Sequence, residues 1–294
     1  MFGLRSDGKK VKINDPIQRL VPHFMDSRTA SQNFIFQDID CVNLDNFIRT
    51  ERENGTSYNY MHIVIATIVR VFYLKPELNR FVVNGRLFDR YAKDGKNIQV
   101  SITVKKHLSE GSPEAVIKYA FTGKETLDQV KELVDNLIRE TTSSKEDALK
   151  EANKTEKAAK WFRLLPNGLI KFAIGCIKWL DRHGSLPKGL IKASPFHSSC
   201  YLTNLKSIRT DAIYHHLYEF GTTSMFISMG KEEEHVVVDD IEEISKSKVM
   251  KLGMTIDERI TDGFYFAKAL KLFKKYLTCP ELLLNDVKKD DLSK

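Results

Sequence analysis

The chain has 294 residues, of which 42% are hydrophobic and 29% charged, a balance typical of a globular protein with a sizeable core. No stretch approaches the roughly 18 consecutive apolar residues of a membrane-spanning helix, and the first residues lack the apolar core of a signal peptide. The net charge of +7 comes from one segment, since residues 154–192 hold nine Lys or Arg against two acidic residues, which argues against a general nucleic-acid-binding protein.

The first half of the chain predicts alternating strands and helices. Apolar residues at helical spacing predict helices where Gly or Pro marks an end, and alternating runs predict strands. An Asn-Gly pair between two such runs predicts a hairpin. In chain order we expect a strand and helix within 11–28, a strand at 33–40, helices at 44–53 and 60–74, a hairpin at 81–88, strands at 97–105 and 114–121, and a helix at 126–139.

The second half opens with residues 143–160, which are rich in Lys, Glu and Ala and predict a solvated helix or linker. Strands are expected at 200–204, 224–229, 236–240 and 249–256, and a helix at 262–277. Strands and helices alternate without a strict βαβ repeat. We therefore predict one α/β domain over residues 1–294, in the form of an α+β two-layer sandwich. Its sheet is mixed and largely antiparallel, and a basic amphipathic helical segment is inserted at about 145–195.

The four cysteines lie far apart and form no Cys-x-x-Cys pair. That spacing argues against a zinc site and is typical of a reducing compartment. We therefore expect a cytoplasmic protein with no metal, in which Cys41, Cys176, Cys200 and Cys279 are free thiols.

Near the C-terminus, residues 257–263 read Asp-Glu-Arg-Ile-Thr-Asp-Gly, and an apolar helix and Pro-Glu-Leu-Leu follow. This stretch resembles the Asp-His-Arg-x-x-Asp-Gly signature of dihydrolipoyl acyltransferase catalytic domains. Chloramphenicol acetyltransferase and peptide-synthetase condensation domains share its His-x-x-x-Asp-Gly core. Glu258 stands here at the position of the histidine.

Further stretches resemble the same proteins in the expected order, at residues 73–79, 82–88, 97–104, 202–205 and 225–230. Together they cover about residues 15–140 and 195–285. The sequence is identified as a member of the chloramphenicol acetyltransferase-like superfamily, closest to the dihydrolipoyl acyltransferase catalytic domain of 2-oxo acid dehydrogenase complexes.

The resemblance implies a homotrimer whose active sites lie between subunits, in a channel that coenzyme A and lipoamide enter from opposite sides. The expected activity is transfer of an acyl group from coenzyme A, or another thioester, to an unknown small-molecule acceptor. The alternative is a catalytically inactive homolog that acts as a trimeric scaffold or ligand-binding protein.

The family's histidine is a general base, and Glu258 would replace it only if burial raised its pKa substantially. Otherwise Glu258 forms an ion pair with Arg259 or with a neighbouring subunit. By resemblance, Thr203 would supply the oxyanion-stabilising hydroxyl; the alternative is an ordinary strand threonine.

The resemblance also implies residues that shape the site without reacting. Asp262, Gly263 and Arg259 match the motif. In the family the aspartate forms a salt bridge with an arginine near the N-terminus, for which Arg19 is the nearest candidate.

Other histidines offer an imidazole in place of the missing one. His215 and His216 precede a predicted core strand, and because they are adjacent we expect at most one of them to enter a site. His197 lies close to the Thr203 strand, whereas His62 is in a helix that is predicted to be buried. Cys200 has no evident paired base, so it is a weak candidate nucleophile.

The basic segment at residues 161–193 has no counterpart in the dihydrolipoyl pattern. Lys171 and Lys178 lie seven residues apart on one helical face, and Trp161 and Trp179 flank the apolar run. Such a helix can lie in a membrane interface or cover a hydrophobic acceptor. The alternative is a helical hairpin that packs on the trimer with its lysines in solvent.

Overall fold

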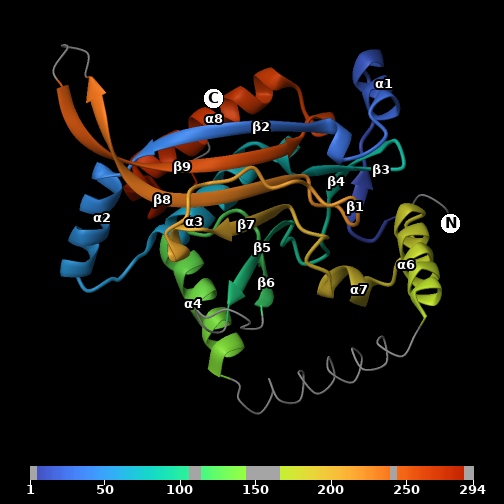
Figure 1. Ribbon diagram of the computed structural model, residues 1–294, viewed down its shortest axis with the longest axis horizontal. Coiled ribbons are helices and arrows are strands. Elements are labelled where there is room, and N and C mark those ends of the chain that lie inside the picture. The colour runs from blue at the N-terminus through green and yellow to red at the C-terminus, as the bar shows by residue number, and fades with distance from the viewer. Residues whose placement is uncertain (1–4, 106–113, 144–165, 239–243, 288–294) are drawn as a thin grey trace.

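The computed structural model describes residues 5–105, 114–143, 166–238 and 244–287. In this part of the chain, a six-stranded sheet has the order β2-β9-β8-β7-β5-β6 and carries its main helices on one face (Figure 1). The strands are β2 (Gln32–Asp40), β5 (Ile98–Lys105), β6 (Glu114–Phe121), β7 (Cys200–Asn204), β8 (Met225–Val238) and β9 (Ile244–Asp257). A smaller sheet comprises β1 (Gly8–Lys10), β4 (Arg86–Arg90) and β3 (Arg80–Val83).

Helices supply the second layer and several peripheral contacts. The described helices are α1 (Pro16–Phe24), α2 (Val42–Glu53), α3 (Tyr60–Leu74), α4 (Leu127–Ser143), α6 (Asn167–Arg182), α7 (Lys188–Ala193) and α8 (Gly263–Thr278). The predicted α/β fold class is confirmed. Of the five pairings in the large sheet, β5–β7 and β7–β8 are parallel and the other three are antiparallel.

Most expected elements form where local patterns place them. The hairpin turns at Asn84 (φ 52°) and Gly85 (φ 67°), the left-handed pair that suits a two-residue hairpin loop. One prediction was wrong, because the separate strands expected at 224–229 and 236–240 belong to the single strand β8, which has a register shift between Met229 and Glu232. The strand expected after residue 11 lies earlier, as β1. The linker at 143–160 falls almost entirely outside the described residues.

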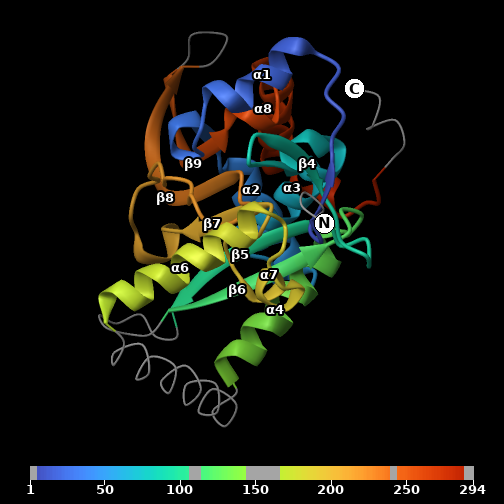
Figure 2. The ribbon, with the colours of Figure 1, turned by 90° about the vertical axis from the view of Figure 1, so that its right-hand side faces the viewer.

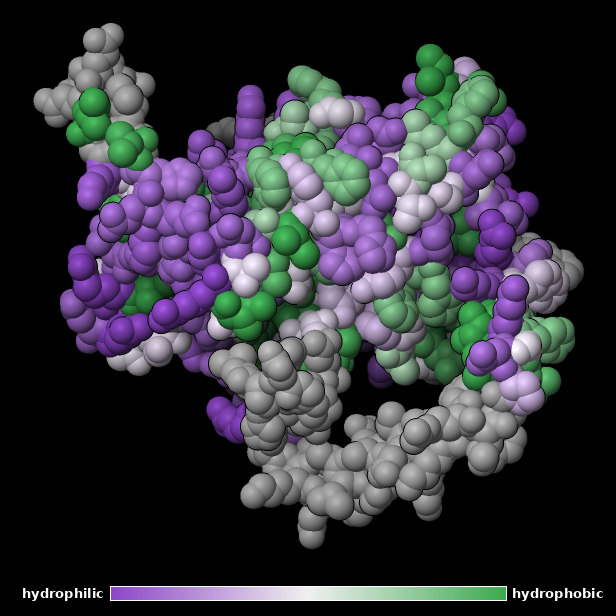
Figure 3. Space-filling view, viewed as in Figure 1, coloured by the Kyte–Doolittle hydropathy of each residue, from purple (hydrophilic) through white to green (hydrophobic). Residues whose placement is uncertain are grey.

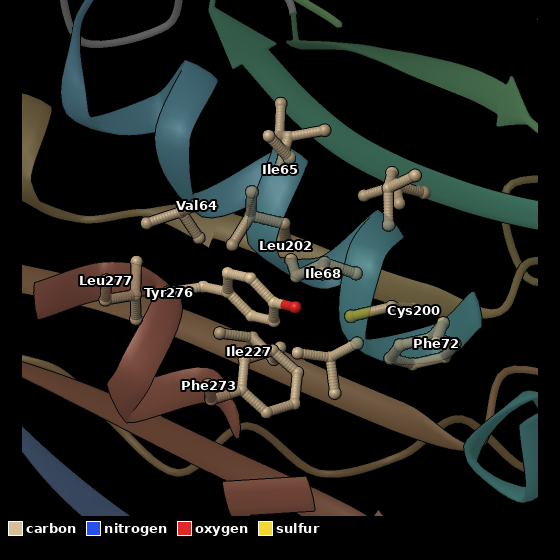
Figure 4. Close-up of a cluster of buried hydrophobic side chains, with 14 of the residues drawn as sticks. Val64, Ile65, Ile68, Phe72, Cys200, Leu202, Ile227, Phe273, Tyr276 and Leu277 are labelled. Carbon is tan, nitrogen blue, oxygen red and sulfur yellow. The ribbon is translucent and has the colours of Figure 1, made fainter. Parts of the chain in front are cut away.

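The core lies between the large sheet and helices α3, α4 and α8. Helix α3 is buried on nearly all sides. Its Ile68 and Phe72 lie among Leu202 of β7, Ile227 of β8 and Phe273 of α8 (Figure 4). A helix that is apolar all round is the kind that a sheet and other helices can enclose.

His62 confirms the expectation of a core residue. It is 2% exposed, completes the capping box of α3 with Asn59, and contacts Asp135 of α4 at 3.0 Å. Burial lowers its pKa against the opposing effect of Asp135.

Candidate active site

The face of the large sheet away from the main helices carries the residues of interest. Because strand side chains alternate, Leu252 and Met254 of β9 enter the core, while Gly253, Thr255 and Asp257 point to the opposite face. The segment 205–224 crosses this opposite face, as its contacts with β8 and β9 show.

Gly253 allows that segment to lie directly on the sheet. A Cβ at Gly253 would stand 2.3 Å from the carbonyl oxygen of Ile213, which is closer than real contacts permit. Beside it, the Ser228 hydroxyl donates to that same oxygen at 2.6 Å and accepts from the Ile213 N–H at 3.1 Å. The backbone just before His215 is therefore held in place by side chains of the sheet.

His215 lies flat on the sheet. Its ring stacks on Phe226 of β8 with centroids 3.9 Å apart and planes within 4°. Its Nδ1 donates to the carbonyl oxygen of His216 at 2.8 Å, which leaves the lone pair on Nε2. Burial lowers the pKa of His215 from its usual value near 6.5, so the ring is a neutral proton acceptor at pH 7. His216 stacks beside it, with centroids 4.7 Å apart, but is exposed.

Thr203 lies on the same face as His215. Tyr201 of β7 is opposite Phe226, and Thr203 follows Tyr201 by two residues, a step of about 7 Å along the strand. Thr203 is partly buried, and its hydroxyl has no hydrogen-bond partner in the described part of the chain. The neighbouring Thr103 hydroxyl is occupied by the Tyr201 hydroxyl at 2.6 Å. Thr203 is therefore a free donor one side-chain row from His215.

Glu258 lies far from Thr203 along the strand direction. Thr203 is level with Ser228 and Gly253 in the sheet, and Glu258 follows Gly253 by five residues, roughly 15 Å farther along the strand direction. The Glu258 side chain is partly buried and accepts from the Asn33 amide at 2.7 Å. One copy of the chain therefore does not bring Thr203 and Glu258 to the same reacting atom.

Arg259 pairs with Asp257, not with Glu258. Its guanidinium donates to both oxygens of Asp257 at 2.8 Å, which corrects the Glu258–Arg259 alternative. Arg28 lies 3.7 Å from the same carboxylate, and burial lowers its pKa. Arg28 also donates to the carbonyl oxygen of Tyr218 at 2.7 Å. This cluster ties the motif to the N-terminal region and to the segment that carries His215.

Asp262 does not form the expected salt bridge. It is exposed and caps α8, accepting from the Tyr265 N–H at 2.8 Å. Arg19 lies on the exposed α1, and the described residues contain no ion pair between Arg19 and Asp262. A Cβ at Gly263 would meet only open space. The buried ion pair lies instead between Asp257 and Arg28, which no sequence pattern identifies.

His197 and Cys200 have structural surroundings. His197 is fully buried between Asp181 at 3.2 Å and the Ser194 hydroxyl at 2.8 Å. Arg5 donates to the same Asp181 oxygen at 2.8 Å, so this cluster fastens the end of α6 to the body. Burial raises the pKa of the Cys200 thiol, which disfavours the nucleophilic thiolate.

The described residues contain neither a candidate metal site nor a membrane-spanning helix. Among these residues, no three His, Cys, Asp or Glu side chains come together as a possible metal site. No described helix is long and apolar enough to cross a membrane.

Comparison with known proteins agrees with this architecture. The family described as 2-oxoacid dehydrogenases acyltransferase (catalytic domain) matches residues 221–285, which include Glu258. No curated protein matches the sequence. A probable dihydrolipoamide acetyltransferase from Listeria monocytogenes superposes with a TM-score of 0.55 at 14% identity, covering 92% of this chain and 94% of that chain.

Two further solved structures share the fold. The Azotobacter vinelandii dihydrolipoamide acetyltransferase gives a TM-score of 0.54 at 12% identity, over 94% of this chain and 95% of that one. A chloramphenicol acetyltransferase gives 0.51 at 12% identity, over 92% and 99%. The chain therefore has the fold of the dihydrolipoamide and chloramphenicol acetyltransferases, and its residues 221–285 match the acyltransferase catalytic-domain family.

Proposed function

We propose that the protein is an acyltransferase that moves an acyl group from coenzyme A, or another thioester, to a small-molecule acceptor. The observation that carries this proposal is the placement of His215 and Thr203 one row apart on the face of the sheet away from the main helices. A neutral imidazole can remove a proton from the acceptor. A hydroxyl without a partner can donate to the oxyanion of a tetrahedral intermediate.

We propose a homotrimer as the active form. Thr203 and Glu258 lie roughly 15 Å apart along the strand direction within one chain. A site that uses both residues therefore needs a second subunit to bring its Glu258 to this face. In the Azotobacter vinelandii enzyme, a serine, a histidine and an asparagine were investigated for their role in the catalytic mechanism. Thr203 and Glu258 are the counterparts that the resemblance gives to the first two.

The general base in this proposal is either His215 or Glu258. His216, the exposed neighbour of His215, provides the control. The experiment is a thioester-cleavage assay on the pure protein with acetyl-CoA and a panel of small acceptors. We expect His215→Asn and Thr203→Val each to lower kcat about 10²-fold or more, and His216→Asn to leave it within twofold. Full loss in Glu258→Gln with little change in His215→Asn would assign the base to Glu258.

The alternative function is a catalytically inactive trimeric scaffold or ligand-binding protein. Glu258 at the histidine position favours it. A wild-type protein that cleaves no thioester, yet binds coenzyme A or assembles as a trimer, would support this alternative and reject the acyltransferase.

We also propose the domain organisation, the cellular location and a membrane contact of the protein. The chain is proposed to be a single domain over residues 1–294, supported by one core cluster that runs from Ile39 to Leu283. A cytoplasmic location is proposed from the cysteine pattern. A peripheral membrane contact through residues 161–193 is a separate proposal, which depends on α6 and α7 and not on the acyl-transfer residues.

A further inference from the structure

A cavity of about 520 Å³ lies beside residues 5–7, the loop after β4, strands β5 and β6, and α7. Figure 2 shows α7 next to β5 and β6 on the side of the molecule that carries the N-terminus. The volume falls in the range of about 300–1,000 Å³ that is typical of small-molecule sites. None of the candidate acyl-transfer residues lines it.

Five lysines from three separate elements line this cavity. They are Lys93 and Lys96 of the loop after β4, Lys118 of β6, and Lys188 and Lys192 of α7. None of them forms an ion pair within the described part of the chain. The cavity therefore carries an excess of positive charge, since five lysines and Arg5 line it against Asp7 and Asp94.

The two acidic residues of the lining form no ion pair with these lysines, although the charge of Asp7 acts on Lys118 and favours its charged form. Asp7 receives two hydrogen bonds from the Arg5 guanidinium, at 2.8 and 3.1 Å. Asp94 accepts from the Lys96 backbone N–H at 3.1 Å. Neither carboxylate lies in an ion pair with a cavity lysine.

Lys118 connects two elements that line the cavity, β6 and α7. Its Nζ donates to the carbonyl oxygens of Ile191 and Ser194, at 3.1 and 3.2 Å, and so fastens the end of α7 to β6. Burial, with a contribution from Arg90, lowers the pKa of Lys118 to about 7. A bound anion would offset that burial cost, because it would stabilise the charged amine.

The cavity also has an apolar surface. Ala92, Ala120 and Ile191 line it between the lysines. An inorganic ion would leave this apolar surface in contact with water, whereas the organic part of a larger ligand would bury it. The ligand that fits both parts carries phosphate on a compact apolar or aromatic body.

We propose that this cavity binds a small organic phosphate, with its phosphoryl groups among the lysines of α7 and of the loop after β4 and its organic body on Ala92, Ala120 and Ile191. Lysine is a usual partner of phosphate because its ammonium is a compact positive charge. The proposal does not rest on the acyl-transfer activity, and the protein would bind this ligand even if it transferred no acyl group.

The test is isothermal titration calorimetry of the intact chain at roughly physiological ionic strength, with ADP, pyrophosphate and adenosine as probes. The pocket variant is Lys188→Glu with Lys192→Glu. Its matched control is Lys171→Glu with Lys178→Glu, which changes the charge equally on exposed residues of α6 outside the cavity. Lys96→Glu probes a second wall, in case the changes on α7 disturb that short helix.

We expect saturable one-to-one binding of ADP, with weaker binding of pyrophosphate and none of adenosine. Both Lys96→Glu and the α7 variant should weaken ADP binding at least tenfold, and the α6 control should stay within twofold. Absence of saturable ADP binding to the wild type would overturn the proposal. So would equal losses in the pocket variant and its control, because that result would show only general attraction to a basic surface. Equal affinity for pyrophosphate and ADP would overturn the assignment of an organic ligand.

Discussion

Two buried arginines depend on one carboxylate in this protein. Asp257 is fully buried, and Arg28 and Arg259 are 4% and 8% exposed. We predict that Asp257→Asn destabilises the fold by about 3–5 kcal/mol, because it leaves two buried charges without a full counter-charge. Urea unfolding of the variant and the wild type measures this difference.

The variant Asp262→Ala should lose less stability than Asp257→Asn. Asp262 is exposed and serves as the N-cap of α8, so its loss should cost about 1 kcal/mol. A larger loss of stability in Asp262→Ala than in Asp257→Asn would contradict the assignment of these two residues.

The pH dependence of activity reports on His215. A lowered pKa means that the imidazole stays neutral at pH 7 and gains its proton only below about 6.5. If His215 is the base, thioester cleavage should be constant from pH 8 to 7 and decline as the pH falls below about 6.5, where the ring becomes charged. A decline whose midpoint lies above pH 6.5 would exclude His215 as the base, because burial lowers the pKa of this imidazole.

At the scale of one element, α6 has an apolar face and a cationic face that are largely exposed in the described part of the chain. Leu169, Phe172 and Trp179 are 53%, 70% and 51% exposed, and at 100° per residue they lie on one side of the helix. Lys171, Lys178 and Arg182 occupy the adjacent side, and only Asp181 is buried. Figure 3 shows apolar surface over this helix. An apolar face beside a cationic face is the pattern of an interfacial helix.

We predict that α6 binds anionic membranes. In a Trp161→Phe background, the fluorescence of Trp179 should shift to shorter wavelength with anionic vesicles, and not with zwitterionic ones. Added salt should weaken the shift, because each Lys or Arg near the surface contributes about 1 kcal/mol that salt screens.

A charge-matched pair of variants checks this prediction. Lys171→Glu with Lys178→Glu should abolish the shift, whereas Lys271→Glu with Lys274→Glu on exposed positions of α8 should keep it. If the fluorescence emission of Trp179 lies at short wavelength without vesicles and does not change when they are added, α6 packs against protein in the assembled molecule.

At the scale of the whole molecule, the apolar face of α1 is exposed in the described part of one copy of the chain. Ile17 and Phe24 are 73% and 81% exposed, and Leu20 between them is 51% exposed. Apolar patches of this kind are typical of contacts between proteins. Figure 3 shows the patch over α1, and the proposed trimer would bury it.

We predict that light scattering at micromolar concentration gives the mass of a trimer. Ile17→Asp with Phe24→Asp should shift the mass to that of the monomer, because two buried charges would oppose the interface. Val42→Asp, a change at an exposed apolar residue at the start of α2, should leave the trimer intact. A wild-type protein that stays monomeric would reject both the trimer and an active site built between subunits.

Local patterns in the sequence determined the elements themselves. The apolar run of α3, the Asn-Gly turn between β3 and β4, and the alternation in β9 each act through neighbours only a few residues away. Such patterns cannot show that β8 continues through a bulge, because the shift appears only when β8 pairs with β9.

Only the tertiary structure decided which charged residues meet. Arg28 and Asp257 are separated by more than 200 residues, so no spacing in the sequence reveals their ion pair, and the motif alone favoured Asp262. The family resemblance made Thr203 and Glu258 candidates, and the position of His215 before a predicted core strand made it a third. The sheet register then placed His215 near Thr203 and Glu258 far from it, because distances between side chains follow from strand pairing and not from order along the chain.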